Sequence, residues 1–361
     1  LDMLFTFNIA LSIMVLLVMT VLISAVLPAQ AATVNSASLG GIQVFPKDHV
    51  WNTPVDTLPV DARSANYVNT IGSSRSISYY FGFPYNVVTS AQAKQRFTTL
   101  NAYSDNVAYP VPANPLVEDL CADRHMLIID RDSRTLYELY NAQKGSNGLW
   151  TASSGSVWNL SDYKFRKNNV TPMWSADAAG LPVFAGLLRY DEVSSGEITH
   201  ALRFTVPSMR GDYIWPARAS APLGKITDPK YPPAGQRFRL KASYNISGYP
   251  PQAKVILQAL KTYGAMANTL NGRGNPITIT GCPDTRWDYT DLNTLWRVNI
   301  TDFEAVDVSS LMIDPDSAQA LQPPTPIPTP TPAQTPVTTP APVTQDPPDE
   351  EIPWGVLVIA G

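Results

Sequence analysis

The sequence has few of the residues that carry metal and nucleophile chemistry. It contains 2 cysteines and 3 histidines in 361 residues, with no HExxH motif and no pair of histidines or cysteines at zinc-ligand spacing. It also lacks GxSxG, the motif that presents a nucleophilic serine at a strand-to-helix turn. Residues 130–135, DRDSRT, place arginine where a calcium loop needs carboxylates or glycine, and predict a hairpin turn. We therefore expect no metal and no cofactor, and the sequence disfavours a serine or cysteine hydrolase.

An excess of charge of one sign is missing from the middle of the chain. Five of the 30 acidic residues lie near the two ends, which leaves 26 basic and 25 acidic side chains elsewhere; the five are Asp2, Asp346, Asp349, Glu350 and Glu351. A nucleic-acid binder presents a basic field. The balance of charge therefore argues against a nucleic-acid partner, and no RNA-binding or DNA-binding motif is present.

The first thirty residues lack lysine and arginine and are rich in apolar residues. The apolar run from Met3 to Leu27 is followed by a small-x-small pattern that ends at Ala31. We predict a signal peptide over residues 1–31 and a short linker over 32–41. The run is also long enough to span a bilayer, so a retained transmembrane helix is the alternative.

The C-terminal part is dominated by proline and threonine. Residues 323–348 hold 11 of the 33 prolines and no aromatic residue, so they cannot build a core. We predict an extended stalk over residues 314–351, with threonines suited to O-glycosylation. The apolar run at 352–361 predicts the start of a membrane anchor, and a short hydrophobic tail is the alternative. Both ends indicate an extracellular protein anchored at the cell surface.

Cysteines and glycosylation sequons are consistent with export. In an oxidising compartment Cys121 and Cys282 are expected to form one disulfide, which would stabilise the fold by about 4 to 5 kcal/mol through chain entropy. Two reduced, buried thiols are the alternative. Four Asn-X-Ser/Thr sequons predict a glycoprotein: Asn159, Asn169, Asn245 and Asn299.

Residues 42–313 show the pattern of one β-rich domain. Short apolar runs bounded by turn residues predict one hairpin from residues 125–130 and 135–140, and another from 186–193 and 198–206. Further strands are predicted in DYIWPAR (212–218), GQRFRLKASYNI (235–246) and NPITITG (275–281).

Helical signals are confined to two stretches. Prolines followed by good helix formers predict one main helix near residues 251–268, and a shorter helix is predicted near 290–297. We therefore predict a mainly β fold, of the β-sandwich or jelly-roll type, with α+β as the alternative.

Several long motifs resemble an uncharacterised family of secreted microbial proteins. They are DHVWNTPVDTLPVD, DRHMLIIDRDSRTLYELYNA, WSADAAGLPVFAGLLRYDEV, GEITHALRFTV, YIWPAR, GQRFRLKASYNI, GCPDTRWD and DFEAVDVSSLM. The resemblance covers about residues 47–312. It implies a shared fold and an extracytoplasmic setting, and carries over no activity and no catalytic residue.

Two histidines stand at the beginnings of predicted strands. Strand alternation places His200 on the same face as Leu202, and His125 begins a strand that is apolar on both faces. At the rim of a core an imidazole can bond to a carbonyl or to a carboxylate such as Asp123 or Glu197, or it can meet a ligand. The structural and the functional roles both stay open at this point.

Aromatic and charged residues that suit sugar recognition lie in two segments. DYIWPAR supplies an aromatic platform and an arginine fork suited to uronates, and a disulfide would hold GCPDTRWD close to His125. We predict four catalytic residues, His200, His125, Asp284 and Tyr213. We predict four binding residues, Arg218, Trp215, Arg286 and Trp287.

These observations favour a cell-surface domain that engages extracellular polysaccharide or cell-envelope glycan, and a polysaccharide-degrading enzyme is one form of this function. Glycoside hydrolysis needs two facing carboxylates, and a lyase needs a His or Tyr base. The available carboxylates are Asp191, Glu192, Glu197, Asp284 and Asp288. The alternative is a non-catalytic adhesin or a structural protein of the cell envelope. Convergence of His125, His200, Asp284 and Arg218 in one cleft would favour ligand chemistry, and dispersal would favour the scaffold.

Overall fold

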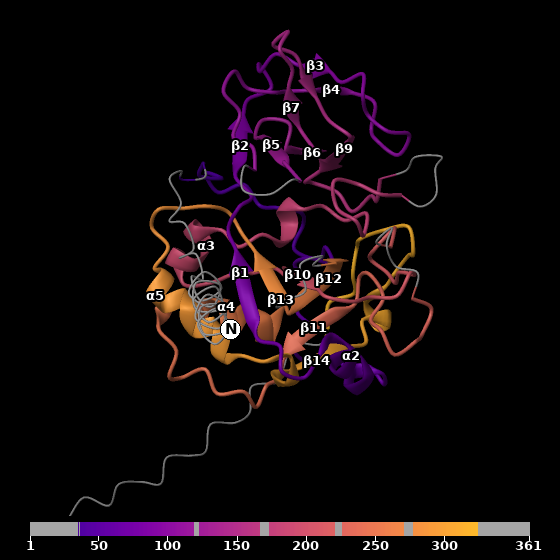
Figure 1. The fold of residues 1–361 in the computed structure, drawn as a ribbon, viewed down its shortest axis with the longest axis vertical. Helices are drawn as coiled ribbons and strands as arrows, with labels where there is room; N and C mark the ends of the chain where they lie inside the picture. The colour runs from indigo at the N-terminus through magenta and orange to yellow at the C-terminus, as the bar shows by residue number, and fades with distance from the viewer. Residues whose placement is uncertain are drawn as a thin grey trace, which may run out of the picture. The chain divides into compact units, whose positions relative to one another are not determined.

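The structure is a computed structural model that describes residues 35, 37–118, 123–166, 173–220, 226–270 and 277–323 (Figure 1). The predicted signal peptide, the membrane anchor, Cys121, Asn169 and most of the stalk lie outside these residues. In the part of the chain that is described, no helix has the length and apolar character needed to cross a membrane.

The larger of two main sheets has six strands in the order β1-β13-β10-β12-β11-β14. Strand β10 lies in its interior, parallel to β12 and antiparallel to β13. All five residues of β10 are buried, because neighbouring strands and packed layers cover both its edges and both its faces. The bounds are β1 Ile77–Tyr80, β10 Leu202–Val206, β11 Arg237–Leu240, β12 Ala265–Leu270, β13 Ile277–Thr280 and β14 Phe303–Val306.

The smaller main sheet has four strands in the order β2-β5-β6-β9. Strands β5 and β6 form the predicted hairpin, and Arg134 in its turn adopts a left-handed φ of 51°. The bounds are β2 Tyr85–Val88, β5 Met126–Asp130, β6 Thr135–Tyr140 and β9 Ser154–Asn159. Two short pairs complete the described strands: β3 Gln95–Arg96 with β4 Ala108–Tyr109, and β7 Gln143–Lys144 with β8 Trp150–Thr151.

Strand β5 joins two hydrophobic clusters. Leu127 and Ile129 on one face belong to the main core, which also includes Phe204 of the larger sheet. Met126 and Ile128 on the other face belong to a second cluster. The alternation of side chains along a strand accounts for this division, and the prediction that β5 is buried on both faces is confirmed.

Four α-helices and four short 3-10 helices connect the described strands. Helix α4 packs its apolar stripe, including Ile256 and Leu260, into the main core. The helices are α2 Ser64–Ile71, α3 Tyr190–Ser195, α4 Pro251–Thr262, α5 Tyr289–Leu292, η1 Phe184–Gly186, η2 Asn293–Arg297, η3 Ile300–Asp302 and η4 Ser309–Leu311. The short helix predicted near 290–297 corresponds to α5 and η2.

The main helix is shorter than predicted. It ends at Thr262, and the chain continues as strand β12 where the sequence predicts helix up to residue 268. Gly264 has a left-handed φ of 64°, and a Cβ at this position would lie 2.2 Å from the carbonyl oxygen of Phe238. Glycine therefore ends the helix here, as it commonly does at a helix C-terminus.

The predicted second hairpin is wrong. Residues 190–195 form α3 instead of a strand, and the amide of Gly196 donates to the carbonyls of Glu192 and Val193. Gly196 is left-handed, with φ 91°, so SSG is the end of a helix and not a hairpin turn.

The DYIWPAR segment is not a strand either. Among the described residues it forms only an isolated bridge, between Tyr213 and Ala234. Pro216 has no amide donor, which disfavours a continuous ladder at this point.

The chain is mainly β, as predicted, with mixed sheets and few helices. Parallel pairs join β1 to β13, β10 to β12 and β2 to β5. A jelly roll is an antiparallel architecture, so this pairing does not confirm a sandwich or jelly roll. The ordered chain also continues beyond residue 313, since Ser317 bridges to Lys164 and Ala320 bridges to Met312.

Candidate functional site

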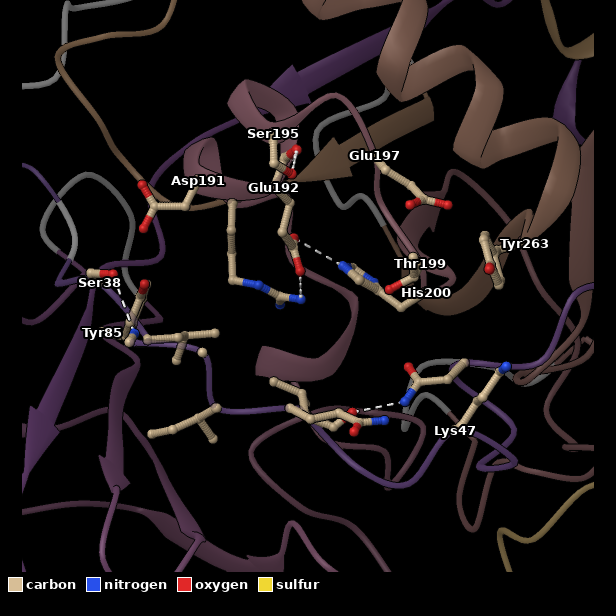
Figure 2. A pocket seen from close by; sticks show the side chains of 18 of the residues that line it. Ser38, Lys47, Tyr85, Asp191, Glu192, Ser195, Glu197, Thr199, His200 and Tyr263 are labelled. Atoms are coloured by element: carbon tan, nitrogen blue, oxygen red, sulfur yellow. Dashed lines mark hydrogen bonds and ion pairs between the residues drawn. The ribbon is translucent and has the colours of Figure 1, made fainter.

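A cavity of about 670 Å³ is lined by α3, the segment 197–200 and the N-terminal segment 38–47 (Figure 2). We call it the α3 cavity. Its volume lies within the roughly 300–1,000 Å³ typical of small-molecule sites. Figure 2 shows Ser38 and Tyr85 at one end of the view and Tyr263 at the other.

A chain of charged groups crosses the wall of this cavity. Arg189 Nη2 donates to Glu192 Oε1 at 2.5 Å, and His200 Nε2 lies 3.2 Å from Glu192 Oε2. Although burial acts to raise the pKa of Glu192, the charges of Arg189 and His200 outweigh it and bring the pKa to about 2. Glu192 is therefore a fixed carboxylate that positions its neighbours and cannot serve as a proton donor at neutral pH.

Both ring nitrogens of His200 face acceptors. Nδ1 lies 2.8 Å from the carbonyl oxygen of Ala201, and Nε2 faces Glu192. Both contacts are hydrogen bonds only when both nitrogens carry hydrogen, which is the imidazolium form. The structure therefore places His200 in the cavity wall with its orientation fixed by two partners.

A second, smaller cavity adjoins the first and shares Tyr85, Arg189 and Asp191 with it. Arg286 lies at its edge, 2.7 Å from Asp284 Oδ2 and 3.1 Å from Asp191 Oδ1. The guanidinium of Arg286 also covers the ring of Tyr190, at 4.2 Å from the centroid. Of the predicted residues, His200, Asp284 and Arg286 thus line two adjoining cavities.

Asp284 is held as a carboxylate beneath Arg286. Burial acts to raise the pKa of Asp284, but the hydrogen bonds and charge of Arg286 lower it below its usual range. Asp284 is only 2% exposed, so it positions Arg286 and is not open to a ligand in this arrangement.

Tyr85 lines both cavities. Its side chain is 3% exposed, and within the described part of the chain its hydroxyl has no hydrogen-bond partner. Burial raises the pKa of Tyr85, so the phenol stays protonated at neutral pH. It can therefore both donate and accept a hydrogen bond.

His125 does not line either cavity. Its Nδ1 lies 2.6 Å from Glu118 Oε2, and its Nε2 lies 3.0 Å from the carbonyl oxygen of Ala176. Burial acts to lower the pKa of His125, yet the hydrogen bond and charge of Glu118 raise it overall. His125, just before strand β5, therefore lies in a buried contact with Glu118 and apart from His200, so the structure does not bring these two predicted catalytic residues together.

The residues of DYIWPAR lie apart from both cavities. Tyr213 is 42% exposed, and the Trp215 Nε1 donates to the carbonyl of Ser317 at 2.9 Å. Arg218 Nη2 donates to Asp316 Oδ1 at 2.8 Å. Trp215 and Arg218 thus contact residues 315–317. The structure does not bring Tyr213, Trp215 and Arg218 into one site with His200.

Trp287 has a packing role. It is 4% exposed, its Nε1 donates to the carbonyl of Cys282 at 2.9 Å, and its ring stacks on Phe81. The predicted binding surface of Trp287 is therefore covered. Cys282 is itself buried, and because Cys121 lies outside the described residues the disulfide stays a prediction.

Sequence reasoning missed Tyr85, Arg189 and the segment 38–47 as parts of the site. Arg189 stands in an apolar run for which the sequence predicts a strand. An arginine in such a run is the one signal that the sequence offers for a buried, paired charge at this position. Residues 38–47 carry no motif, and the predicted linker over residues 32–41 includes part of this segment. Within the described ranges, no group of three His, Cys, Asp or Glu side chains could hold a metal ion.

Comparisons with protein-family models, curated proteins and solved structures found no match to this chain. The resemblance to an uncharacterised family of secreted microbial proteins therefore stays a prediction.

Proposed function

We propose that this chain engages extracellular glycan through the α3 cavity. The observation that supports the proposal is the convergence of Asp191, Glu197 and His200 with two tyrosines, Tyr85 and Tyr263, around a cavity of about 670 Å³. Carboxylates accept hydrogen bonds from sugar hydroxyls, and tyrosine combines an apolar ring with a polar tip. A concave site with a few convergent polar groups is the usual form of a ligand site.

The proposal includes a cell-surface location. Its support is the apolar N-terminal run, the Pro/Thr-rich stalk and the apolar C-terminal run of the sequence. The partner is an extracellular polysaccharide or a cell-envelope glycan, and the membrane contact is made through the terminal anchor.

Cleavage of the glycan is the enzymatic form of this proposal. The exposed carboxylate of Glu197 lines the cavity and is open to a glycan. His200 would take part in proton transfer by exchanging its contact with Glu192 or with the Ala201 carbonyl for one with the glycan. Glu192 would hold His200 in place and would not itself transfer a proton, because its pKa is about 2.

A glycan array followed by a polysaccharide activity screen tests the proposal on the full chain. We expect binding that is lost in Glu197→Ala and retained in Glu304→Ala, a matched control whose carboxylate pairs with Arg239 and does not line the cavity. If a folded chain binds no glycan and cleaves no polysaccharide, the proposal is contradicted. If it cleaves one, His200→Ala should abolish cleavage.

The second candidate is a non-catalytic adhesin or a structural protein of the cell envelope. The observation that favours it is the dispersal of His125 and Arg218, which engage Glu118 and Asp316 in separate ion pairs. Binding of envelope proteins without binding of any glycan on the array would support this candidate.

A further inference from the structure

The two arginines around the α3 cavity and its smaller neighbour are already paired with carboxylates. Arg189 Nη2 lies 2.5 Å from Glu192 Oε1, and Arg286 Nη2 lies 2.7 Å from Asp284 Oδ2. An arginine that is paired in this way cannot offer its fork to a second carboxylate without giving up the first. The Nη2 atom of each arginine is therefore occupied, and a uronate that approached it would compete with Glu192 or Asp284.

Carboxylates outnumber the permanent cations around the two cavities. Four carboxylates line them, Asp191, Glu192, Glu197 and Asp284, against three permanent cations, Lys47, Arg189 and Arg286. Lys47 is solvent-exposed, and an exposed ammonium adds little to the binding of a carboxylate. Asp191 and Glu197 are exposed as well, so solvent also weakens their repulsion of an anion. A uronate would still add to an excess of negative charge around the cavities, whereas a neutral sugar would leave that charge unchanged.

The hydroxyl of Tyr85 has the properties needed to contact a neutral sugar. It lies between the two cavities, its side chain is 3% exposed, and no partner occupies it among the residues that the structure describes. The hydroxyl is not among the fully buried polar atoms of the described residues that lack a partner, so water or a ligand can reach it. A sugar hydroxyl can both accept from it and donate to it.

We infer that the α3 cavity selects an uncharged sugar over a uronate, with the Tyr85 hydroxyl as a direct contact. This inference rests on the proposed function, and it names the class of glycan that the same site takes. It also replaces the uronate preference suggested by DYIWPAR, because Arg218 in that segment is paired with Asp316.

Calorimetric titration of the full chain with matched polymers tests the inference. Each uronate polymer is compared with its own carboxyl-reduced form, so that the two probes differ only at C6 of each reduced sugar, which carries a carboxylate in one and a hydroxymethyl group in the other. We expect the neutral form to bind about tenfold more tightly or better. Equal affinity or tighter binding of the uronate would overturn the inference and leave the proposed function intact, whereas binding of neither form would count against the proposed function.

Two pairs of variants test the residues. Tyr85→Phe should weaken binding of the neutral sugar by about threefold to tenfold, and Tyr213→Phe, which lies outside both cavities, should not. Asp191→Asn should reduce the difference in binding affinity between the uronate polymer and its neutral form. Asp212→Asn makes the same charge change outside the cavities and should leave this difference in affinity unchanged. Unchanged affinity in Tyr85→Phe would show that the Tyr85 hydroxyl does not contact the sugar. An unchanged difference in affinity in Asp191→Asn would contradict the inference that negative charge around the cavity disfavours a uronate.

Discussion

Arg203 and Asp177 form a buried ion pair beside the larger sheet. Arg203 Nη2 lies 2.6 Å from Asp177 Oδ2, and Asn268 Nδ2 donates to the same oxygen at 2.6 Å. Both charged side chains are nearly inaccessible, so neither has water as an alternative partner. A charge buried in this way depends on its partner, because the desolvation cost remains when the partner is removed.

Asp177→Ala should therefore lower the free energy of unfolding by about 3 to 5 kcal/mol. Asp316→Ala removes the partner of Arg218 in a pair where the aspartate is 57% exposed, and should cost less than about 1 kcal/mol. Urea denaturation of both variants beside the parent measures the difference. Equal costs for the two variants would show that burial does not determine the strength of these pairs.

The histidines show what strand alternation can and cannot predict for a single residue. Their places just before β5 and β10 follow from the sequence pattern, and both side chains are buried as expected at the rim of a core. Their partners do not follow from the pattern, because Glu118 and Ala176 reach His125 from other segments while Glu192 reaches His200 from α3. A local pattern carries no information on which segments pack together.

Helix α4 receives its N-terminal cap from another element. Its own N-cap residue, Pro250, makes no side-chain cap, but Asp291 of α5 accepts hydrogen bonds from the amides of Gln252 and Ala253, both at 2.8 Å. The carboxylate satisfies two amides that lack helical partners and complements the positive end of the helix dipole. Packing of α5 against α4 is thus coupled to the start of the helix.

Asp291→Ala should lower the free energy of unfolding by about 1 to 2 kcal/mol, the usual cost of losing a helix cap. Asp291→Asn keeps one acceptor oxygen and should retain part of this stabilisation. Chemical denaturation monitored by far-UV circular dichroism measures both effects. If the alanine variant loses less than about 0.3 kcal/mol in its free energy of unfolding, then water stabilises the two amides as well as the Asp291 carboxylate does.

Elements were predicted well where one local pattern was unambiguous. The β5–β6 hairpin and the start of α4 at Pro251 follow from alternation and from proline at a helix N-terminus. Two errors fall at Gly196 and Gly264, where glycine with positive φ ends a helix, and a third is the strand predicted in DYIWPAR. A glycine between apolar runs is compatible with a hairpin turn or with a helix cap, and the packing of the flanking residues decides between them.

At the scale of the whole molecule, export and a long-range disulfide are linked predictions. Cys282 is buried next to the smaller cavity, so a bridge to Cys121 would tie the segment before β5 to the segment after β13. A cross-link between residues so far apart in sequence acts mainly by restricting the unfolded chain.

Non-reducing peptide mapping of protein isolated from the cell surface should recover one peptide pair that contains Cys121 and Cys282. A reductant should then lower the free energy of unfolding by about 4 to 5 kcal/mol. The same reductant should have no effect on a Cys121→Ala variant. Two reduced thiols in secreted protein would contradict the disulfide.

The sequence by itself determined the mainly β class, the neutral middle of the chain, one hairpin and the beginning of the main helix. Only the tertiary structure decided which polar residues share a cavity. Segments 38–47 and 189–200 meet Tyr85 and Tyr263 there, although they are far apart along the chain. The physical reason is that hydrophobic periodicity specifies which face of an element is buried, whereas the order and direction of strands in the sheets specify which buried faces and loops come together.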